Sequence, residues 1–243
     1  MSFDGQRAII MGASSGIGEA TARAFAAAGA RVIITGRSKE RLDAAAQRIG
    51  YPVEARELDA TDSEAVTGFF ATAGIVDHLV LALSPGAVAL GPLADLDEND
   101  LRRAFDGKLF AHVKVLKAAL PKLRPGASVT IISAASANAA AAGTAGLAAV
   151  NGALQAMVPP LATELAPVRV NAVSPGVIDT PWWHGMPEPD RAAFFESVAA
   201  VAPVGRVGHP EDVASSVLYL AGNGFVTGTV LDCSGGMTLA TGR

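Results

Sequence analysis

Met11-Gly12-Ala13-Ser14-Ser15-Gly16-Ile17-Gly18 is the stretch that decides the fold. It stands between the apolar run 8–10 and an alanine-rich segment that begins near Glu19. Glycine at position 12 permits a turn that a Cβ would obstruct, and glycines at 16 and 18 allow close approach to a ligand and to a sheet. The N-terminus of a following helix offers unpaired N–H groups to phosphate. The stretch therefore predicts a strand-to-helix turn that cradles a dinucleotide pyrophosphate, with a tight turn that binds no ligand as the alternative.

Length and composition indicate one unit that handles a small molecule. The chain has 243 residues, of which 50% are hydrophobic and 17% charged, so we expect a single domain over residues 1–243. The net charge is −4 and the basic residues form no run, which argues against a nucleic-acid partner and against a basic membrane-binding face. We therefore expect a small-molecule substrate or ligand.

The cysteine count and the apolar runs indicate the compartment. Cys233 is the only cysteine, so the sequence excludes an intramolecular disulfide and a zinc cage of several cysteines. We expect a packed thiol, a reducing compartment and no metal site. No uncharged apolar run reaches the roughly 18 residues that a membrane span needs. The expectation is a soluble, cytoplasmic protein with no membrane partner.

Short β-branched runs alternate with longer helical patterns along the chain, which predicts a parallel sheet with helices on both faces. Such a doubly wound α/β sheet is the Rossmann type. Strands are predicted near residues 7–11, 31–35, 53–58, 77–83, 128–133, 168–174 and 228–232. Helices are predicted near residues 16–29, 38–49, 62–73, 97–123, 144–165 and 210–222, with Pro159-Pro160 expected to remove backbone hydrogen bonds and bend the fifth.

Three further positions fit a bound dinucleotide. Arg37 ends the second strand, where a guanidinium favours the 2′-phosphate of NADP and an acidic residue would favour NAD, although an ordinary surface arginine is the alternative. Asp59 follows the third strand, where a carboxylate could read the adenine amino group. The Pro175-Gly176 turn ends the sixth strand, where the second half of a dinucleotide could touch backbone. NADP is the favoured cofactor.

A lysine lies on the apolar face of the long helix predicted over 97–123. Lys108 and His112 share that face with Leu101, Phe105 and Val115. One interpretation is that Lys108 leans into the site. The alternative is that Lys108 extends its amine to water and that His112 is a satisfied helix residue.

Residues 181–208 predict a lid over the substrate. The segment contains four prolines and opens with Trp182, Trp183 and His184, and a short helix is expected around 191–198. These side chains and Met186 suggest an apolar or aromatic ligand. A subunit contact is the equal alternative for the tryptophan pair.

The order of these motifs resembles the short-chain dehydrogenase/reductase family over essentially the whole chain. The family's Thr-Gly-x-x-x-Gly-x-Gly turn matches residues 12–18, with Met11 in place of threonine, and its Val-Asn-x-Val-x-Pro-Gly stretch matches residues 170–176. Asp59 matches its aspartate after strand three, and Thr180 matches the threonine that contacts the nicotinamide carboxamide. Thr227-Gly228 and Ser234-Gly235-Gly236 resemble the family's Thr-Gly and Asp-Gly-Gly, with serine replacing aspartate.

The resemblance implies a seven-stranded sheet and a homo-oligomer, a tetramer or a dimer, formed through the two long helices and the last strand. Together with the residue patterns it gives the expected cofactor-binding set, which is Gly12, Ser14, Ser15, Gly16, Ile17, Gly18, Arg37, Asp59, Pro175, Gly176, Ile178 and Thr180.

The catalytic positions of the family are not matched. Its members use a Tyr-x-x-x-Lys pair, an earlier serine and an asparagine on the preceding long helix. Aligned from residues 164–165 and 175–176, these positions read Leu147 for tyrosine, Asn151 for lysine and Ala134 for serine, and spacing to residues 120–121 gives Lys108 for asparagine. An alignment slip cannot restore the pair, because the only tyrosines are Tyr51 and Tyr219 and no lysine follows position 122.

Three functional hypotheses remain. The first is an NADP(H)-binding oxidoreductase with a non-standard active site in which Lys108 supplies the ammonium missing at Asn151 and serves as the candidate catalytic residue. Quinones and iminium ions would suit it better than simple ketones, because their reduction needs less proton donation. The second is a catalytically silent NADP(H)-binding sensor or inactive partner subunit. The third is a scaffold protein that binds no nucleotide.

Overall fold

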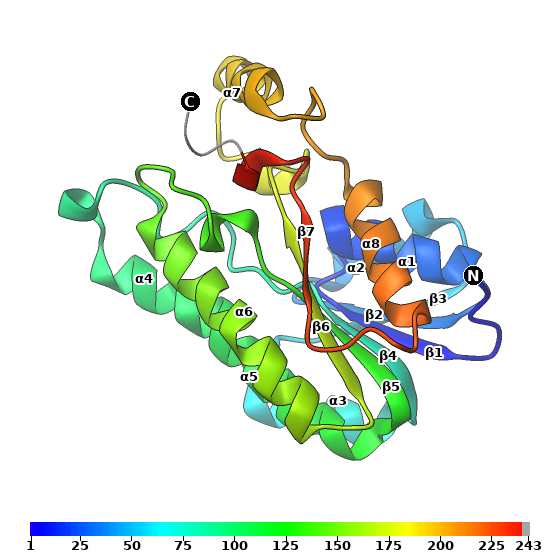
Figure 1. The fold of residues 1–243 in the computed structure, drawn as a ribbon. Helices are drawn as coiled ribbons and strands as arrows, with labels where there is room; N and C mark the ends of the chain where they lie inside the picture. Colours follow the sequence, from blue (N-terminus) through cyan, green and yellow to red (C-terminus); the bar gives the residue numbers. More distant parts are fainter. Residues whose placement is uncertain (240–243) are drawn as a thin grey trace.

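The computed structural model describes residues 1–239. Their sheet has seven parallel strands in the order β3-β2-β1-β4-β5-β6-β7 (Figure 1). The chain reverses its direction of progress across the sheet between β1 and β4, which confirms the predicted doubly wound, Rossmann-type fold. The strands are β1 Arg7–Met11, β2 Arg31–Gly36, β3 Val53–Glu57, β4 Val76–Leu81, β5 Leu123–Ile132, β6 Arg169–Pro175 and β7 Val230–Cys233.

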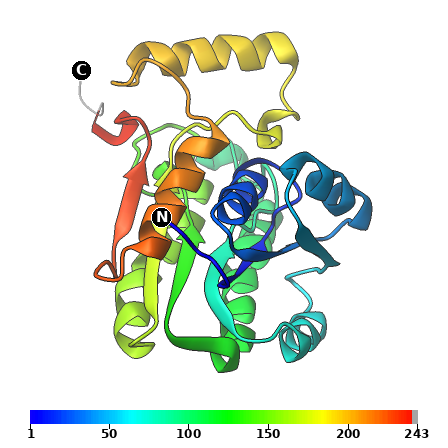
Figure 2. The same ribbon diagram turned by 90° about the vertical axis from the view of Figure 1, so that its right-hand side faces the viewer.

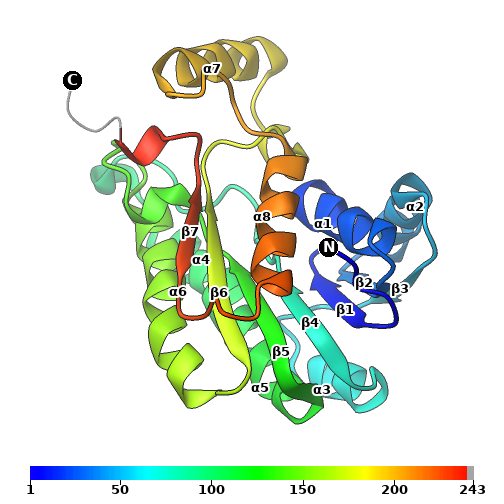
Figure 3. The same ribbon diagram turned by 45° about the vertical axis from the view of Figure 1, so that its right-hand side comes forward.

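Helices cover both faces of the sheet (Figures 1 and 3). Two apolar clusters form the core, one on each face. One face carries α1 Gly16–Ala27, α2 Lys39–Ile49 and α8 Pro210–Gly222, which pack through Phe25, Leu42 and Val217. The other carries α3 Ser63–Thr72, α5 Ala111–Ala119 and α6 Ala145–Glu164, which pack through Phe70, Val115 and Leu154. Because helices cover both faces, all six residues of β4 are buried, including the polar Asp77 and His78.

Side chains cap the N-termini of α2 and α3, which also follow strands of the sheet. Asp62 accepts from the N–H groups of Glu64 and Ala65 at the start of α3, at 2.9 and 3.1 Å. Ser38 at the start of α2 accepts from the N–H of Arg41 at 3.3 Å. Ser15 occupies the same position for α1, but its side chain makes no capping bond. The glycine-rich turn therefore leads to a helix N-terminus without a side-chain cap.

The long helix predicted over 97–123 is not one regular helix. It consists of α4 Glu98–Ala104, a π-helical turn Phe105–Phe110, α5, and a 3₁₀ turn Leu120–Lys122. The π turn contains Gly107, where an added Cβ would lie 2.7 Å from the Cβ of Pro85. That close approach brings the chain after β4 against the π turn. The uniform helical spacing assumed from the sequence was therefore wrong around Lys108.

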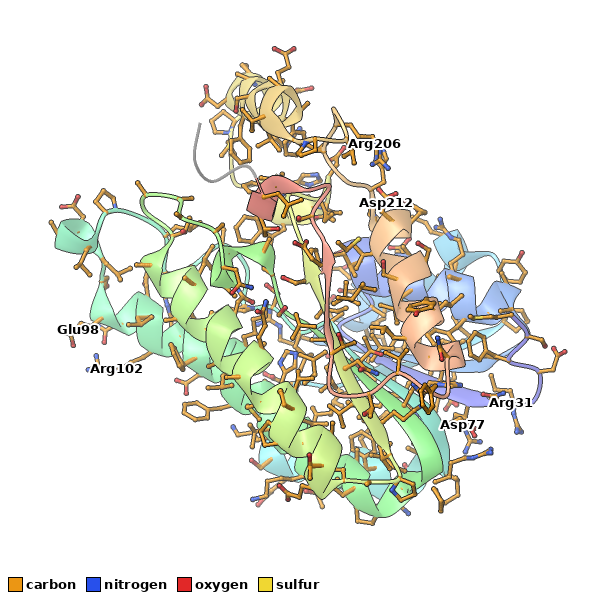
Figure 4. The ribbon with its side chains drawn as sticks, viewed as in Figure 1. Arg31, Asp77, Glu98, Arg102, Arg206 and Asp212 are labelled. Atoms are coloured by element: carbon orange, nitrogen blue, oxygen red, sulfur yellow. The ribbon has the colours of Figure 1, made fainter. Side chains whose placement is uncertain are left out.

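The segment predicted as a lid leaves the sheet after β6 and returns at α8. Its helix, α7, runs from Glu188 to Val201 and is longer at both ends than the expected 191–198. In Figures 1 and 2, α7 stands away from the layered body, and Val198 is its only buried residue. The two ends of the segment meet at a parallel bridge between Ile178 and Gly208. An ion pair of Arg206 with Asp212, at 2.7 and 2.9 Å, ties the returning end to α8 (Figure 4).

Two smaller expectations have clear outcomes. Cys233 is a packed thiol, with its Sγ 3.6 Å from the Asp212 carbonyl oxygen, and burial raises its pKa. α6 continues through Pro159 and Pro160, and the hydroxyl of Thr163 donates to the Pro159 carbonyl oxygen at 3.2 Å.

Within residues 1–239, no helix combines the length and apolarity needed to cross a membrane.

Candidate cofactor site and active site

The glycine-rich turn joins the carboxyl end of β1 to α1 and has no room for side chains at its key positions. Gly12 has a φ of +86°, and an added Cβ there would lie 2.5 Å from the Ala82 carbonyl oxygen. An added Cβ at Gly18 would collide with the Gly12 carbonyl oxygen. Both glycines are therefore required by close backbone approach, as predicted.

The first turn of α1 is suited to an anion. Ser14, Ser15 and Ile17 are partly exposed beside it. Glu19, the one acidic residue in that turn, pairs with Arg48 through two bonds of 2.7 and 3.0 Å. Because Arg48 neutralises the carboxylate, Glu19 does not oppose a phosphate group at this helix N-terminus. The expected pyrophosphate cradle fits these residues.

Arg37 and Asp59 lie near each other at the carboxyl edge of the sheet. Asp59 accepts from the N–H and the hydroxyl of Thr61 at 2.9 and 2.7 Å. The Thr61 N–H is the largest cause of the lowered pKa of Asp59, and the positive charges of Arg37 and Lys114 add to it. Arg37 itself is exposed and makes no ion pair within residues 1–239. Its guanidinium is thus available to a phosphate group.

The stretch after β6 reaches the glycine-rich turn. An added Cβ at Gly16 would lie 3.2 Å from the Cγ2 of Thr180, so these two predicted residues are in contact. At Gly176 an added Cβ would lie 2.9 Å from the Cα of Ser234, which explains the small residue beside Pro175. The side chain of Ile178 is buried against Gly208, so a cofactor could meet only its backbone.

Lys108 points into the protein and contacts Asn151. Its Nζ donates to the Asn151 Oδ1 at 2.7 Å and lies 3.5 Å from the Ser133 carbonyl oxygen. Burial lowers the pKa of Lys108 to about 8. No ion pair to Lys108 is present in the described part of the chain, and both of its partners are neutral. The alternative of an amine that extends to water was therefore wrong for Lys108.

Asn151 uses all of its donors inside the protein. Its Nδ2 donates to the Ser136 Oγ at 3.1 Å and to the Leu147 carbonyl oxygen at 3.0 Å. Asn151 is 2% exposed, whereas Leu147 and Ser136 are partly exposed. The positions aligned with the family's lysine, tyrosine and asparagine thus meet in space, as the resemblance implies.

Gln155 is a site residue that sequence reasoning missed. Its Nε2 lies 3.1 Å from the Ser133 Oγ, 3.1 Å from the Ser174 Oγ and 3.3 Å from the Ala134 carbonyl oxygen. The amide therefore joins the ends of β5 and β6 to α6. A signal was present in the sequence, because Leu147, Asn151 and Gln155 recur at four-residue spacing and two of them are polar in an otherwise apolar helix.

His112 is a satisfied buried residue, as one alternative held. Its Nδ1 lies 2.7 Å from the Lys108 carbonyl oxygen and its Nε2 lies 3.2 Å from the Leu81 carbonyl oxygen. Burial, together with the charge of Lys108, lowers the pKa of His112 to about 4. The ring is therefore neutral near pH 7 and carries a single N–H, so it donates to one of these two carbonyl oxygens and lies between the π turn and the end of β4.

The tryptophan pair packs within the lid segment. Trp183 donates from its Nε1 to the Ile178 carbonyl oxygen at 3.0 Å and packs on Phe194 with the ring centroids 4.9 Å apart. Trp182 meets Trp183 edge to face at 4.6 Å. His184 is exposed and Met186 is partly buried. Trp183 thus joins α7 to the bridge at Ile178, whereas within residues 1–239 the Trp182 indole makes no side-chain hydrogen bond.

Comparisons with known sequences match nearly the full chain. The family model described as enoyl-(acyl carrier protein) reductase matches residues 12–238. A galactitol 2-dehydrogenase (L-tagatose-forming) of Cereibacter sphaeroides is 36% identical over 249 residues, which cover 98% of this chain and 96% of that protein. A 3-oxoacyl-(acyl-carrier-protein) reductase of Thermotoga maritima is 34% identical over 253 residues, which cover 98% of this chain and 100% of that protein.

Solved structures agree with the sequence matches. A small-chain dehydrogenase in complex with NADPH has 31% identity and a TM-score of 0.84, over 97% of this chain and 100% of that one. A short-chain type dehydrogenase/reductase from Mycobacterium ulcerans has 27% identity and a TM-score of 0.89, over 98% and 92%. The sheet order and the glycine-rich turn define a nucleotide-binding oxidoreductase fold. The chain belongs to the short-chain dehydrogenase/reductase family.

Proposed function

We propose that this chain is an NADP(H)-dependent oxidoreductase with a non-standard active site built on Lys108 and Asn151. One observation carries the proposal. Lysine and asparagine have exchanged places relative to the family's pattern, and the two side chains are in contact at 2.7 Å. A positive charge is thus retained in the same part of the fold, although it enters from the π turn and not from α6.

The residues that would hold the cofactor are those at the carboxyl edge of the sheet. The turn 12–18 and the first N–H groups of α1 suit the pyrophosphate, and Arg37 suits a 2′-phosphate. Asp59 would face the adenine, and residues 175–180 would face the nicotinamide, with Thr180 beside Gly16. When bound, NADPH supplies the electrons and the hydrogen for reduction. We therefore propose NADP(H), with NAD(H) disfavoured by Arg37.

Lys108 would act by stabilising negative charge that develops on the substrate. Its neighbours Asn151 and Ser133 are neutral, so its ammonium is not compensated by a carboxylate in contact. An uncompensated cation stabilises negative charge that develops on a substrate oxygen and repels a cationic substrate. Quinones and conjugated enones fit best, because hydride addition gives a delocalised phenolate or enolate, whose oxygen is less basic than a ketone-derived alkoxide and needs no strong acid. The sequence alone favours iminium ions as much as quinones. The positive charge of Lys108 disfavours them, because it repels a cationic substrate.

The experiment has two stages on the full-length chain. Fluorescence titration with NADPH and NADH measures binding, and NADPH oxidation is then followed by absorbance with quinones, enones, ketones and imines. We expect tighter NADPH binding and turnover confined to quinones or enones. Lys108→Met should lower the turnover number and leave NADPH affinity nearly unchanged. Equal turnover by Lys108→Met would contradict the role of Lys108.

A silent NADP(H)-binding sensor or inactive partner subunit is the second candidate. The observation in its favour is that Asn151 and Gln155 spend their donors on protein acceptors. Clear NADPH binding with no acceptor reduced would favour this function. Failure to bind NADPH would remove both candidates and leave the nucleotide-free scaffold.

We propose that the chain forms a homo-oligomer through the α4–α5 side. Phe110 is 49% exposed there, and a hollow of 380 Å³ is lined by Leu101, Arg102, Phe105, Asp106 and Phe110. The lining comes from α4 and the π turn and includes no residue of the glycine-rich turn, so the cofactor site does not explain this hollow. Light scattering should give a dimer or tetramer mass, and Phe110→Glu should shift it to the monomer.

A further inference from the structure

We propose that the hydroxyl of Ser136 donates the hydrogen bond that orients the substrate oxygen, as the outer end of a chain from Lys108 through Asn151. This inference rests on the oxidoreductase function proposed above. It assigns the orienting role to a residue two positions beyond Ala134, where the family's serine would stand. The 3₁₀ turn Ala135–Ala137, directly after β5, presents this residue at the carboxyl edge of the sheet.

The hydrogen bonds of this chain run in one direction, from Lys108 to Ser136. Lys108 donates to the Asn151 Oδ1, and the Asn151 Nδ2 donates to the Ser136 Oγ at 3.1 Å. Because Ser136 accepts in this bond, its own O–H remains available. No acceptor for that proton is found among residues 1–239. The chain of donors therefore ends on a hydroxyl that can donate outward.

The charge of Lys108 polarises the hydrogen bonds that lead from it to Ser136. A cation bound at the oxygen of an amide draws electron density from its nitrogen and strengthens the N–H groups as donors. A strong donor on the Ser136 oxygen in turn strengthens the Ser136 O–H as a donor. The amide of Asn151 passes on polarisation and no proton. The ammonium of Lys108 thus acts through Ser136 without touching the substrate.

The neighbouring serine hydroxyls are unsuitable for this role. Ser133 is 3% exposed, and its hydroxyl donates to the Val173 carbonyl oxygen at 3.1 Å. Ser174 is 2% exposed and lies under Gln155. Ser136 is partly exposed and lies next to the Leu147 turn of α6 through the shared Asn151 amide. Ser136 is therefore the member of this cluster with both a free proton and access to a ligand.

The role is stabilisation of an oxyanion and includes no proton transfer by Ser136. As a quinone or enone is reduced, its oxygen becomes negative and accepts a hydrogen bond from the Ser136 hydroxyl. This hydrogen bond strengthens as the negative charge grows. The oxygen later takes its proton from water. Leu147, whose carbonyl oxygen accepts from the same Asn151 amide as this hydroxyl, is partly exposed, and its apolar side chain suits the flat ring of such a substrate.

The test measures binding of an oxyanion in place of turnover. para-Nitrophenolate imitates the anion of a reduced quinone, and its absorbance reports its ionised form when it binds to the full-length chain loaded with NADP⁺. Ser136→Ala should weaken this binding about 10- to 100-fold, the range for a hydrogen bond to a charged group. Ser136→Thr, which keeps the hydroxyl, should restore most of the affinity. Ser215→Ala, an exposed serine on α8, is the matched control.

The outcomes separate this inference from the proposed function. NADP⁺ affinity should be equal in all variants and each should unfold cooperatively, which shows that folding and the cofactor site are intact. Ser136→Ala should melt slightly lower, because one buried Asn151 N–H loses its acceptor. Unchanged phenolate binding in Ser136→Ala, or no phenolate binding by the original chain, would overturn the inference. If no acceptor is reduced but Ser136→Ala still loses phenolate, the reaction fails and the role of Ser136 stands. If acceptors are reduced equally fast by Ser136→Ala, the reaction stands and Ser136 is excluded.

Discussion

The Nζ of Lys108 lies 2.7 Å from the Oδ1 of Asn151, across 43 positions of sequence. The lysine comes from a π turn and the asparagine from the middle of α6. A π turn changes the angular spacing of side chains within a helix, and such turns are frequent at functional sites. The contact places a cation where the aligned lysine of the family would carry one, which leads to the first prediction.

Exchanging the two residues back should preserve the pair. Asn151→Lys alone brings two ammonium groups together, and Lys108→Asn alone leaves the buried Asn151 Oδ1 without its donor, so both single variants should unfold at lower temperature. The double variant Lys108→Asn with Asn151→Lys should recover stability, with a coupling free energy of about 1–3 kcal/mol in chemical denaturation. Strictly additive effects of the two substitutions would show that the pair is not a functional unit.

The pKa of Lys108, about 8 in the folded chain against 10.5 ordinarily, predicts two opposite pH effects. Turnover should fall as pH rises through about 8, because the ammonium is lost. Stability relative to Lys108→Met should rise between pH 8 and 10.5, because in that window the unfolded chain binds a proton that the folded chain does not. Pairwise thermal melts at several pH values measure the second effect, and parallel curves would disprove it.

Cofactor choice should depend on Arg37. Arg37→Asp should weaken NADPH binding about 10- to 100-fold, since a charge-assisted bond to the 2′-phosphate is replaced by repulsion. NADH binding should be equal or stronger. Arg31, at the other end of β2, is the control, because it bonds only the Gly5 carbonyl oxygen at 2.6 Å. If Arg31→Ser and Arg37→Asp shift the NADPH preference equally, the assignment of Arg37 is wrong.

Alanine substitutions at Gly12 and Gly50 distinguish the effect of backbone strain from that of steric exclusion. Both have positive φ, +86° and +72°, but an added Cβ meets the Ala82 carbonyl oxygen at Gly12 and nothing within 4 Å at Gly50. Gly50→Ala should cost about 1–2 kcal/mol of stability with NADPH affinity unchanged. Gly12→Ala should cost more and abolish NADPH binding. Retained binding by Gly12→Ala would argue against the turn as a phosphate cradle.

Trp183 should control the order of the lid segment. Trp183→Phe keeps an aromatic ring but removes the bond to the Ile178 carbonyl oxygen, which should cost about 1 kcal/mol and speed proteolysis within 180–208. Trp182→Phe removes no such bond and is the matched control. Identical cleavage rates for the two variants would mean that the indole bond does not hold the segment.

Much of the candidate site could be predicted from the sequence because its residues follow strand ends. Parallel strands bring their carboxyl ends to one edge, so Gly12, Arg37, Asp59 and Pro175 could be assigned to one ligand before any contact was known. Ser136 could not, because it acts through a partner on α6, and spacing along the chain carries no information about such a pair. The spacing of Gln155 from Asn151 indicated a polar stripe on α6 but not which strand ends that stripe meets.

The sequence by itself determined the alternation of strands and helices, the glycine-rich turn and the loss of the Tyr-x-x-x-Lys pair. These follow from local periodicity, from positions where a Cβ is forbidden and from the count of residue types. Only the tertiary structure decided where the amine of Lys108 goes. Its direction depends on how the π turn packs against Pro85 and α6, and that packing selects Asn151 over water as the partner.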